Sequence, residues 1–181
     1  MKNYIGATAL AMIFLFNVTT NCQTDKRDQG IDLYREGKYS AAAALLQEAA
    51  TANPKDRQAW LFLAGAYIHT GEEQLARQAF TNSRVIQKEG LPKYDTPLKI
   101  LQKPQPESPH DRTGPFSVNV SVIVEFLASG KIGFIRVLES GTQEFGEASV
   151  NAAKKIRFKP AVMAGKPVTV IGMLEYSFEA L

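Results

Sequence analysis

The chain has 181 residues, of which 45% are hydrophobic and 22% charged, and its formal net charge at pH 7 is +3. This size and balance fit one ordinary or two small globular domains, and such a mild, scattered positive charge argues against a nucleic-acid-binding protein. The chain contains one cysteine, Cys22, and two isolated histidines, His69 and His110. An intrachain disulfide framework is therefore excluded, and a structural zinc site lacks the clustered ligands that it needs. We expect neither a metal nor a cofactor.

Residues 1–22 have the features of an export signal. Lys2 supplies a positive charge, and an uncharged, apolar run follows from Ile5 to Val18. This run is shorter than the roughly 20 apolar residues that span a bilayer, and it matches the apolar region of a signal peptide. Bacterial lipoprotein signals resemble this arrangement in placing a cysteine directly after the run, which makes Cys22 a candidate lipidation site. Cleavage near Cys22, lipidation and an uncleaved anchor stay open, and each places residues 25–181 in the bacterial periplasm or cell envelope.

Between residues 25 and 90 the sequence repeats itself at an interval of 34 residues. Each unit has small residues where two helices approach closely, a glycine where the first helix ends, and a large apolar residue on the second helix. This pattern predicts two helix–turn–helix units, and it resembles the tetratricopeptide repeat. The residues expected to form the structural core of the units are Gly30, Leu33, Gly37, Ala42, Leu46, Trp60, Tyr67, Gly71, Ala76 and Phe80.

The last helix of the second unit needs a cover, because about three stacked repeats with capped ends are the usual stable minimum. Three segments are candidates for this cover. They are the short apolar segment Leu98–Leu101, the C-terminal domain, and a second copy of the chain. A homodimer is therefore one of the alternatives.

Six prolines fall within residues 91–115. Proline fixes its own φ and disfavours helical geometry in the residue before it. The segment is therefore predicted to be an extended, partly stiff linker between two domains, with at most one short turn near Leu98–Leu101.

Residues 116–181 are predicted to form a small domain of three strands and one helix. Alternating apolar residues predict a strand over residues 117–127, a glycine-containing turn, and a returning strand over 132–139. An apolar stripe then predicts a helix that ends at Pro160, and residues 168–178 alternate as the third strand. On the first strand, the even-numbered residues from Val118 to Phe126 are expected to be buried. The residues expected to face outward are Ser117, Asn119, Ser121 and Glu125.

The order of these elements resembles the C-terminal domain of TonB-family proteins over about residues 97–178. The resemblance implies a β-β-α-β fold with a three-stranded antiparallel sheet, and hence an α+β chain of two domains. Its pieces are a lead-in segment, the strand with its Gly-Lys hairpin, the helix with its aromatic and proline, and the final strand. They are carried by Leu98–Pro106, Val118–Gly133, Ala148–Pro160, Ala161, Gly165–Val168 and Phe178.

In that family the domain is not an enzyme but captures an extended peptide of an outer-membrane transporter by adding it to the edge of its sheet. If the third strand lies beside the first, as the family fold implies, residues 168–178 present the open edge. A proline at Val170 or Leu174 is then expected to weaken partner binding without unfolding the domain. The expected partner-binding positions are Val168, Val170, Gly172, Leu174 and Tyr176.

These features favour a non-enzymatic adaptor in the cell envelope, in which the repeats bind one protein and the TonB-like domain captures a strand of another. No catalytic residues are expected, because the sequence has no histidine-assisted nucleophile and no spacing that forces two carboxylates together. The alternative is a TonB-type transducer that couples a proton-driven inner-membrane motor to outer-membrane transport. The 91–115 linker reaches only roughly 80 Å when fully extended, which favours the adaptor. The expected partners are envelope proteins, with an outer-membrane transporter among the candidates, and membrane association would be peripheral or through a lipid anchor.

Overall fold

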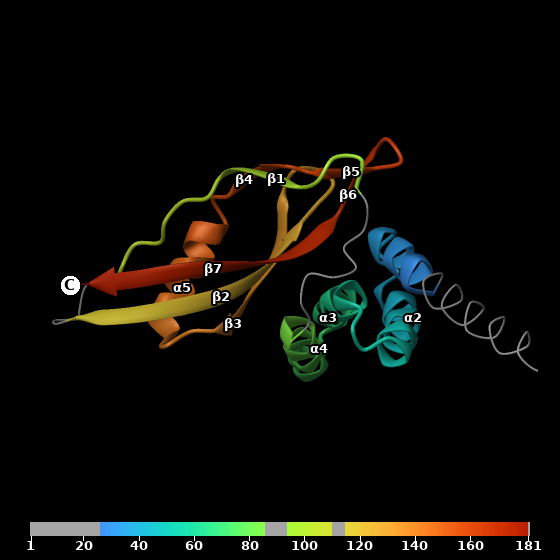
Figure 1. Ribbon diagram of the computed structural model, residues 1–181, viewed down its shortest axis with the longest axis horizontal. Helices are drawn as coiled ribbons and strands as arrows, with labels where there is room; N and C mark the ends of the chain where they lie inside the picture. The colour runs from blue at the N-terminus through green and yellow to red at the C-terminus, as the bar shows by residue number, and fades with distance from the viewer. Residues whose placement is uncertain (1–25, 86–93, 110–114, 181) are drawn as a thin grey trace, which may run out of the picture. The chain divides into compact units, whose positions relative to one another are not determined.

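The computed structural model describes residues 26–85, 94–109 and 115–180 (Figure 1). The chain divides into two compact units, Met1–Gly90 and Leu91–Leu181. In the described residues, helices form the first unit, and an antiparallel sheet with one helix forms the second. The predicted α+β class is therefore confirmed.

The N-terminal unit is described from Lys26 onward, where a helix covers residues 26–35. The predicted signal region, residues 1–22, and the candidate lipidation site Cys22 lie outside the described residues. Within the described ranges, no helix is both long enough and apolar enough to cross a bilayer.

Two helical hairpins make up the described N-terminal unit. The helix of residues 26–35 is followed by α2 (Tyr39–Ala52), and α3 (Arg57–Thr70) is followed by α4 (Glu73–Val85). Helix α3 contacts both α2 and α4, and most of its side chains are buried. The helix at the centre of the unit is therefore the first helix of the second repeat.

The turns within the two hairpins have the same backbone conformation and the same hydrogen bonds. Gly37 and Gly71 both have positive φ, at 78° and 85°, which glycine adopts at no steric cost. The N–H of the residue after each glycine donates to a carbonyl five residues earlier, from Lys38 to Leu33 at 2.9 Å and from Glu72 to Tyr67 at 2.8 Å. These are helix C-terminal caps, and they explain why the sequence places glycine at both positions.

Half of the ten predicted core residues of the helical unit are buried. Trp60 and Tyr67 are half-buried, and each uses its polar atom: Trp60 Nε1 donates to the Pro54 carbonyl at 3.1 Å, and Tyr67 Oη contacts Gln47 Oε1 at 3.1 Å. Leu33 is half-buried, while the two turn glycines are exposed. The buried members are Gly30, Ala42, Leu46, Ala76 and Phe80.

Gly30 allows the first helix to approach α2 closely, and its replacement by alanine is expected to destabilise the helical unit. A Cβ at this position would lie 2.8 Å from Leu46 Cγ, a side chain that is fully buried. Alanine gains about 1 kcal/mol in helix propensity, but overpacking of a buried contact costs about 1–3 kcal/mol. We expect a net loss of about 1 kcal/mol in the free energy of unfolding. Fluorescence of Trp60, the only tryptophan in the sequence, measures it in urea.

Gln29→Ala is the matched control for this prediction, because Gln29 is the exposed neighbour of Gly30. It makes the same change to alanine without entering the contact with Leu46. An equal midpoint for Gly30→Ala and the unchanged chain would contradict the expected net loss, and a midpoint raised by the full gain in helix propensity would show that Leu46 moves aside freely.

The exposed side of α4 is largely polar. Leu75 is the exception among its large side chains, with 41% of its surface exposed. A polar outer face is what terminal repeats need in order to remain in water, so α4 reduces the need for the cover that the sequence analysis anticipated. In the segment Leu98–Leu101, Leu98 and Ile100 pack against the core of the C-terminal unit. The exposed residues of α4 include Glu73, Gln74, Arg77, Gln78, Thr81 and Arg84.

The C-terminal unit is built on a three-stranded antiparallel sheet in the order β3-β2-β7 (Figure 1). The strands are β2 (Phe116–Phe126), β3 (Ile132–Glu139) and β7 (Val170–Ala180), and helix α5 (Gln143–Ala153) contacts β2 and β3. The predicted β-β-α-β order and the position of the third strand beside the first are therefore confirmed.

Four short strands accompany this sheet, and they differ from the sequence expectation. Strand β1 (Lys99–Gln102) pairs with β4 (Arg157–Lys159), and β5 (Ala161–Met163) pairs with β6 (Lys166–Val168). Part of the segment interpreted as a linker is thus a strand of the C-terminal unit.

The predicted helix end is also different, because α5 stops at Ala153 and residues 157–159 are extended. Pro160 disfavours helical geometry at Lys159, and β1 offers a partner for the extended backbone of residues 157–159.

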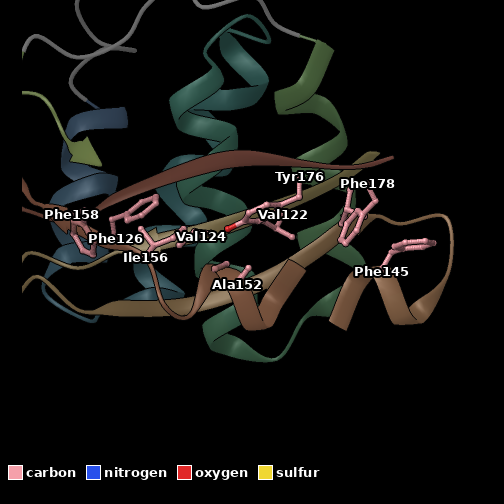
Figure 2. Packing of buried hydrophobic residues seen from close by; sticks show 11 residues of the cluster. Val122, Val124, Phe126, Phe145, Ala152, Ile156, Phe158, Tyr176 and Phe178 are labelled. Atoms are coloured by element: carbon pink, nitrogen blue, oxygen red, sulfur yellow. The ribbon is translucent and has the colours of Figure 1, made fainter. Parts of the chain in front are cut away.

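The core of the C-terminal unit lies between the sheet and α5. Even-numbered side chains of β2, among them Val122, Val124 and Phe126, point into it as predicted (Figure 2). Aromatic rings pack edge to face at both ends of the cluster, with centroids 4.9 Å apart for Phe126 and Phe158 and 4.7 Å apart for Phe145 and Phe178. Such pairs contribute about 0.5–1.5 kcal/mol beyond their buried area.

The opposite face of β2 is less exposed than its alternation predicts. Ser121 and Glu125, expected to face outward, are 6% and 2% exposed. The Glu125 carboxylate accepts a hydrogen bond from the Phe134 N–H at 3.3 Å and fills the space over Gly133, where a Cβ would lie 2.8 Å from its Cδ. Because Gly133 on β3 has no side chain, it leaves room for the buried Glu125 carboxylate. The sequence of β2 alone does not show this contact between strands.

Candidate strand-binding edge of β7

The sheet has two outer strands, β3 and β7, and they differ in regularity. Strand β7 pairs with β2 without interruption over 11 residues, from Val170 opposite Phe126 to Ala180 opposite Phe116. The pairing of β3 with β2 shifts register twice within eight residues. Bulges of this kind twist an edge away from further pairing, whereas a long regular edge is a template for it. The edge that can accept another strand is therefore that of β7.

Backbone groups on β7 alternate between β2 and the open edge, and two hydrogen bonds fix which residues do which. The Leu127 N–H donates to the Lys131 carbonyl at 3.0 Å in the hairpin, so odd-numbered residues of β2 face β3 and even-numbered ones face β7. Independently, the Glu175 carbonyl accepts a hydrogen bond from Lys103 Nζ at 2.6 Å on the open side of β7. The outward-facing N–H and C=O groups therefore belong to the odd-numbered residues Ile171, Met173, Glu175, Ser177 and Glu179.

This alternation changes the roles of the predicted partner-binding residues. Val170, Gly172, Leu174 and Tyr176 lie on β7, but their backbone groups face β2. The side chains of Leu174 and Tyr176 pack in or against the core. Val168 belongs to β6 and pairs with Ala161. By this alternation, a proline at Val170 or Leu174 would remove a bond within the sheet, so we now expect either substitution to weaken the fold as well as partner binding.

The odd-numbered residues were missed because alternation of side chains shows which face is buried but not which way the backbone groups point. In an antiparallel pair, that direction follows from the position of the hairpin bonds. The direction of the backbone groups along β2 could have been counted from the turn at Leu127–Lys131. No sequence pattern relates Lys103 to Glu175, which are 72 positions apart.

Lys103 is a contact of the β7 edge supplied by the chain itself. Its Nζ also lies 4.6 Å from the centroid of the Tyr176 ring, within the range of a cation–π interaction. A strand added to β7 would place a backbone N–H opposite the Glu175 carbonyl, where the ammonium now donates. Lys103 thus occupies one acceptor near the middle of the edge.

Tyr176, a predicted partner-binding residue, is instead part of the core, with 1% of its surface exposed. Among the described residues, its hydroxyl has no hydrogen-bond partner, and an unpaired buried hydroxyl carries a desolvation cost of about 1–3 kcal/mol. We expect Tyr176→Phe to retain the free energy of unfolding or to raise it by about 1 kcal/mol. Urea unfolding followed by circular dichroism measures this, and a loss above about 1 kcal/mol would mean that the hydroxyl has a partner.

The same substitution has an effect at alkaline pH. Burial raises the pKa of the Tyr176 hydroxyl above its ordinary value. The folded state then holds this proton more tightly than the unfolded state, so the stabilising contribution is complete below about pH 10 and is lost as the pH rises through the folded pKa. Tyr176→Phe should lack this part of the alkaline loss.

The described residues contain no group of three or more side chains suited to hold a metal ion. The open edge of β7 offers backbone hydrogen bonds, two carboxylates and one ammonium, which suit recognition of an extended chain.

Both described units contain a segment that matches a known protein family. Residues 27–83 match the tetratricopeptide repeat family, and residues 117–180 match the C-terminal family of the Gram-negative bacterial TonB protein. A solved structure, the solution NMR structure of the Pseudomonas aeruginosa TonB C-terminal domain, is 29% identical over 48% of this chain and 89% of that chain, with a TM-score of 0.38. Comparison with curated proteins gave no match. The two families indicate protein-interaction domains.

Proposed function

We propose that this chain, which joins a tetratricopeptide repeat region to a TonB C-terminal domain, is a non-enzymatic adaptor of the cell envelope. The helical repeats bind one partner protein, and the C-terminal domain captures an extended segment of a second by strand addition to β7. The observation that carries this proposal is the uninterrupted, 11-residue edge of β7 beside the twice-shifted β3. Strand addition uses backbone hydrogen bonds for affinity and the flanking side chains for specificity.

Energy transduction of the TonB type is the second candidate, and it makes use of the same edge. Its spacer would have to cross the periplasm. In this chain, part of the proline-rich segment belongs to the C-terminal unit, because Lys99–Gln102 form β1 and pair with β4. This shortens the extended reach below the roughly 80 Å of the whole segment and favours the adaptor.

Site-specific photo-crosslinking in native envelopes tests the proposal. A photoreactive residue at Ser177, exposed on β7, should trap the strand-forming partner, and one at Glu144, exposed on α5, serves as the control. A third at Leu75, exposed on α4, reports partners of the helical unit. An adaptor gives different proteins at Ser177 and Leu75.

The outcomes separate the two candidate functions. Recovery of an outer-membrane transporter at Ser177 together with inner-membrane motor proteins would favour the transducer. Recovery of periplasmic proteins or lipoproteins would favour the adaptor. The same products at Ser177 and Glu144 would contradict capture by the β7 edge.

A further inference from the structure

The outer half of β7 carries two carboxylates on one face. Glu175, Ser177 and Glu179 are exposed and lie on the side of the sheet opposite α5. On the same face, Met173 is half-buried and Ile171 is buried. Ser177 Oγ and Asn119 Oδ1 are joined by a hydrogen bond of 2.8 Å, so a neutral pair occupies the position between the carboxylates. In the part of the chain that the structure describes, neither carboxylate forms an ion pair.

The spacing of these carboxylates matches the repeat of an added strand. Residues four apart on one strand lie about 13 Å apart on the same face, and a neighbouring strand has the same repeat. Side chains opposite each other on neighbouring strands have Cβ atoms about 4.5–5.5 Å apart, where opposite charges attract and like charges repel. A strand beside β7 would therefore place two of its own side chains, four residues apart, opposite Glu175 and Glu179.

A cationic donor already lies at this edge. Lys103 Nζ donates to the Glu175 carbonyl at 2.6 Å while its charge rests over the Tyr176 ring. The ammonium therefore contacts the backbone carbonyl of Glu175. The side-chain carboxylate of the same residue forms no ion pair in the described part of the chain. The edge thus accepts positive charge through a contact that is independent of the two carboxylates.

We propose that the segment captured by β7 is a basic strand, with lysine or arginine at two positions four residues apart and an apolar residue opposite Met173. This inference rests on the proposed strand addition and specifies the chemistry of the partner. The two basic side chains pair with Glu175 and Glu179, and a backbone N–H of the partner replaces Lys103 at the Glu175 carbonyl. An acidic segment of the same length is rejected by like-charge repulsion.

Two synthetic 11-residue peptides test the proposal on the full chain. Both alternate threonine and valine, and they differ only at two positions four residues apart, which are lysine in one peptide and glutamate in the other. By isothermal titration at low salt, we expect the lysine peptide to bind about tenfold more tightly than the glutamate peptide. The ratio should shrink as salt is added, because exposed charges are screened.

A matched pair of variants assigns the effect to the edge. Glu175→Gln combined with Glu179→Gln should abolish the preference for the lysine peptide. Glu144→Gln combined with Glu147→Gln removes the same charge from exposed positions on α5 and should retain the preference. Equal affinity for the two peptides would overturn the charge proposal while strand addition stands. Binding of neither peptide, or binding that Met173→Pro leaves unchanged, would overturn strand addition itself.

Discussion

Replacing Met173 with proline is expected to lower the affinity for a strand-forming partner by at least about tenfold while the domain stays folded. The Met173 N–H faces the open edge, so the substitution removes no bond to β2, and proline is tolerated on the free side of an edge strand. It deletes one donor of the edge, and its ring obstructs the approach of an added strand. A lost hydrogen bond of about 1 kcal/mol together with this obstruction gives the expected change.

Leu174→Pro is the matched control, one residue further along the same strand. Leu174 lies opposite Val122, and its N–H faces β2, so proline there breaks the ladder and should unfold the sheet. Titration with the captured partner gives the affinity, and circular dichroism gives the folded fraction. Unchanged affinity in folded Met173→Pro would contradict strand addition at β7.

Replacing Phe145 with alanine is expected to remove about 3–5 kcal/mol from the free energy of unfolding of the C-terminal unit. Phe145 is fully buried, and its ring lies 4.7 Å from that of Phe178 and 5.7 Å from that of Phe116. It joins α5 to β2 and β7 at one end of the core (Figure 2). Domains are commonly stable by about 5–15 kcal/mol, so this loss removes much of the margin.

Because Trp60 lies in the helical unit, unfolding of the C-terminal unit can be measured separately from unfolding of the helical unit. Circular dichroism follows both units, whereas tryptophan fluorescence follows the helical unit alone. We expect the circular dichroism of Phe145→Ala to show an early transition while the fluorescence midpoint is unchanged. Val150→Ala, a smaller truncation at a half-buried position of α5, should cost less than the Phe145 variant. Equal shifts in both signals would contradict separate unfolding of the units.

The long elements could be predicted from the sequence because their patterns repeat within themselves. The 34-residue interval placed both helical hairpins, and the alternation from Val118 to Phe126 placed β2 and its buried face. Strands β1 and β4 could not be predicted in this way. Each is too short to show a period, and each is extended because the other, more than 50 positions away, pairs with it.

The candidate site was predicted at the level of the strand but not of its residues. Alternation predicted the strand, and the resemblance to the TonB family implied that it lies at the edge of the sheet. Side-chain periodicity carries no information about the direction of the backbone groups. Even-numbered residues such as Tyr176 therefore seemed to serve the partner, although they hold the sheet and its core together. The outward direction of the Met173 and Glu175 backbone groups follows from the hairpin bond at the end of β2. The role of Lys103 follows from its hydrogen bond to Glu175, a residue far away in the sequence.

The register shifts of β3 would also limit how many copies of the chain could associate through their sheets. A domain with two regular edges can pair head to tail with further copies and grow into an open fibre, since each addition leaves a new template. With one regular edge, a copy that pairs through β7 uses up the template of both molecules, and assembly closes at two. Self-association through β7 and capture of a partner are then mutually exclusive, so the concentration of the chain itself would govern how much of it is free to bind.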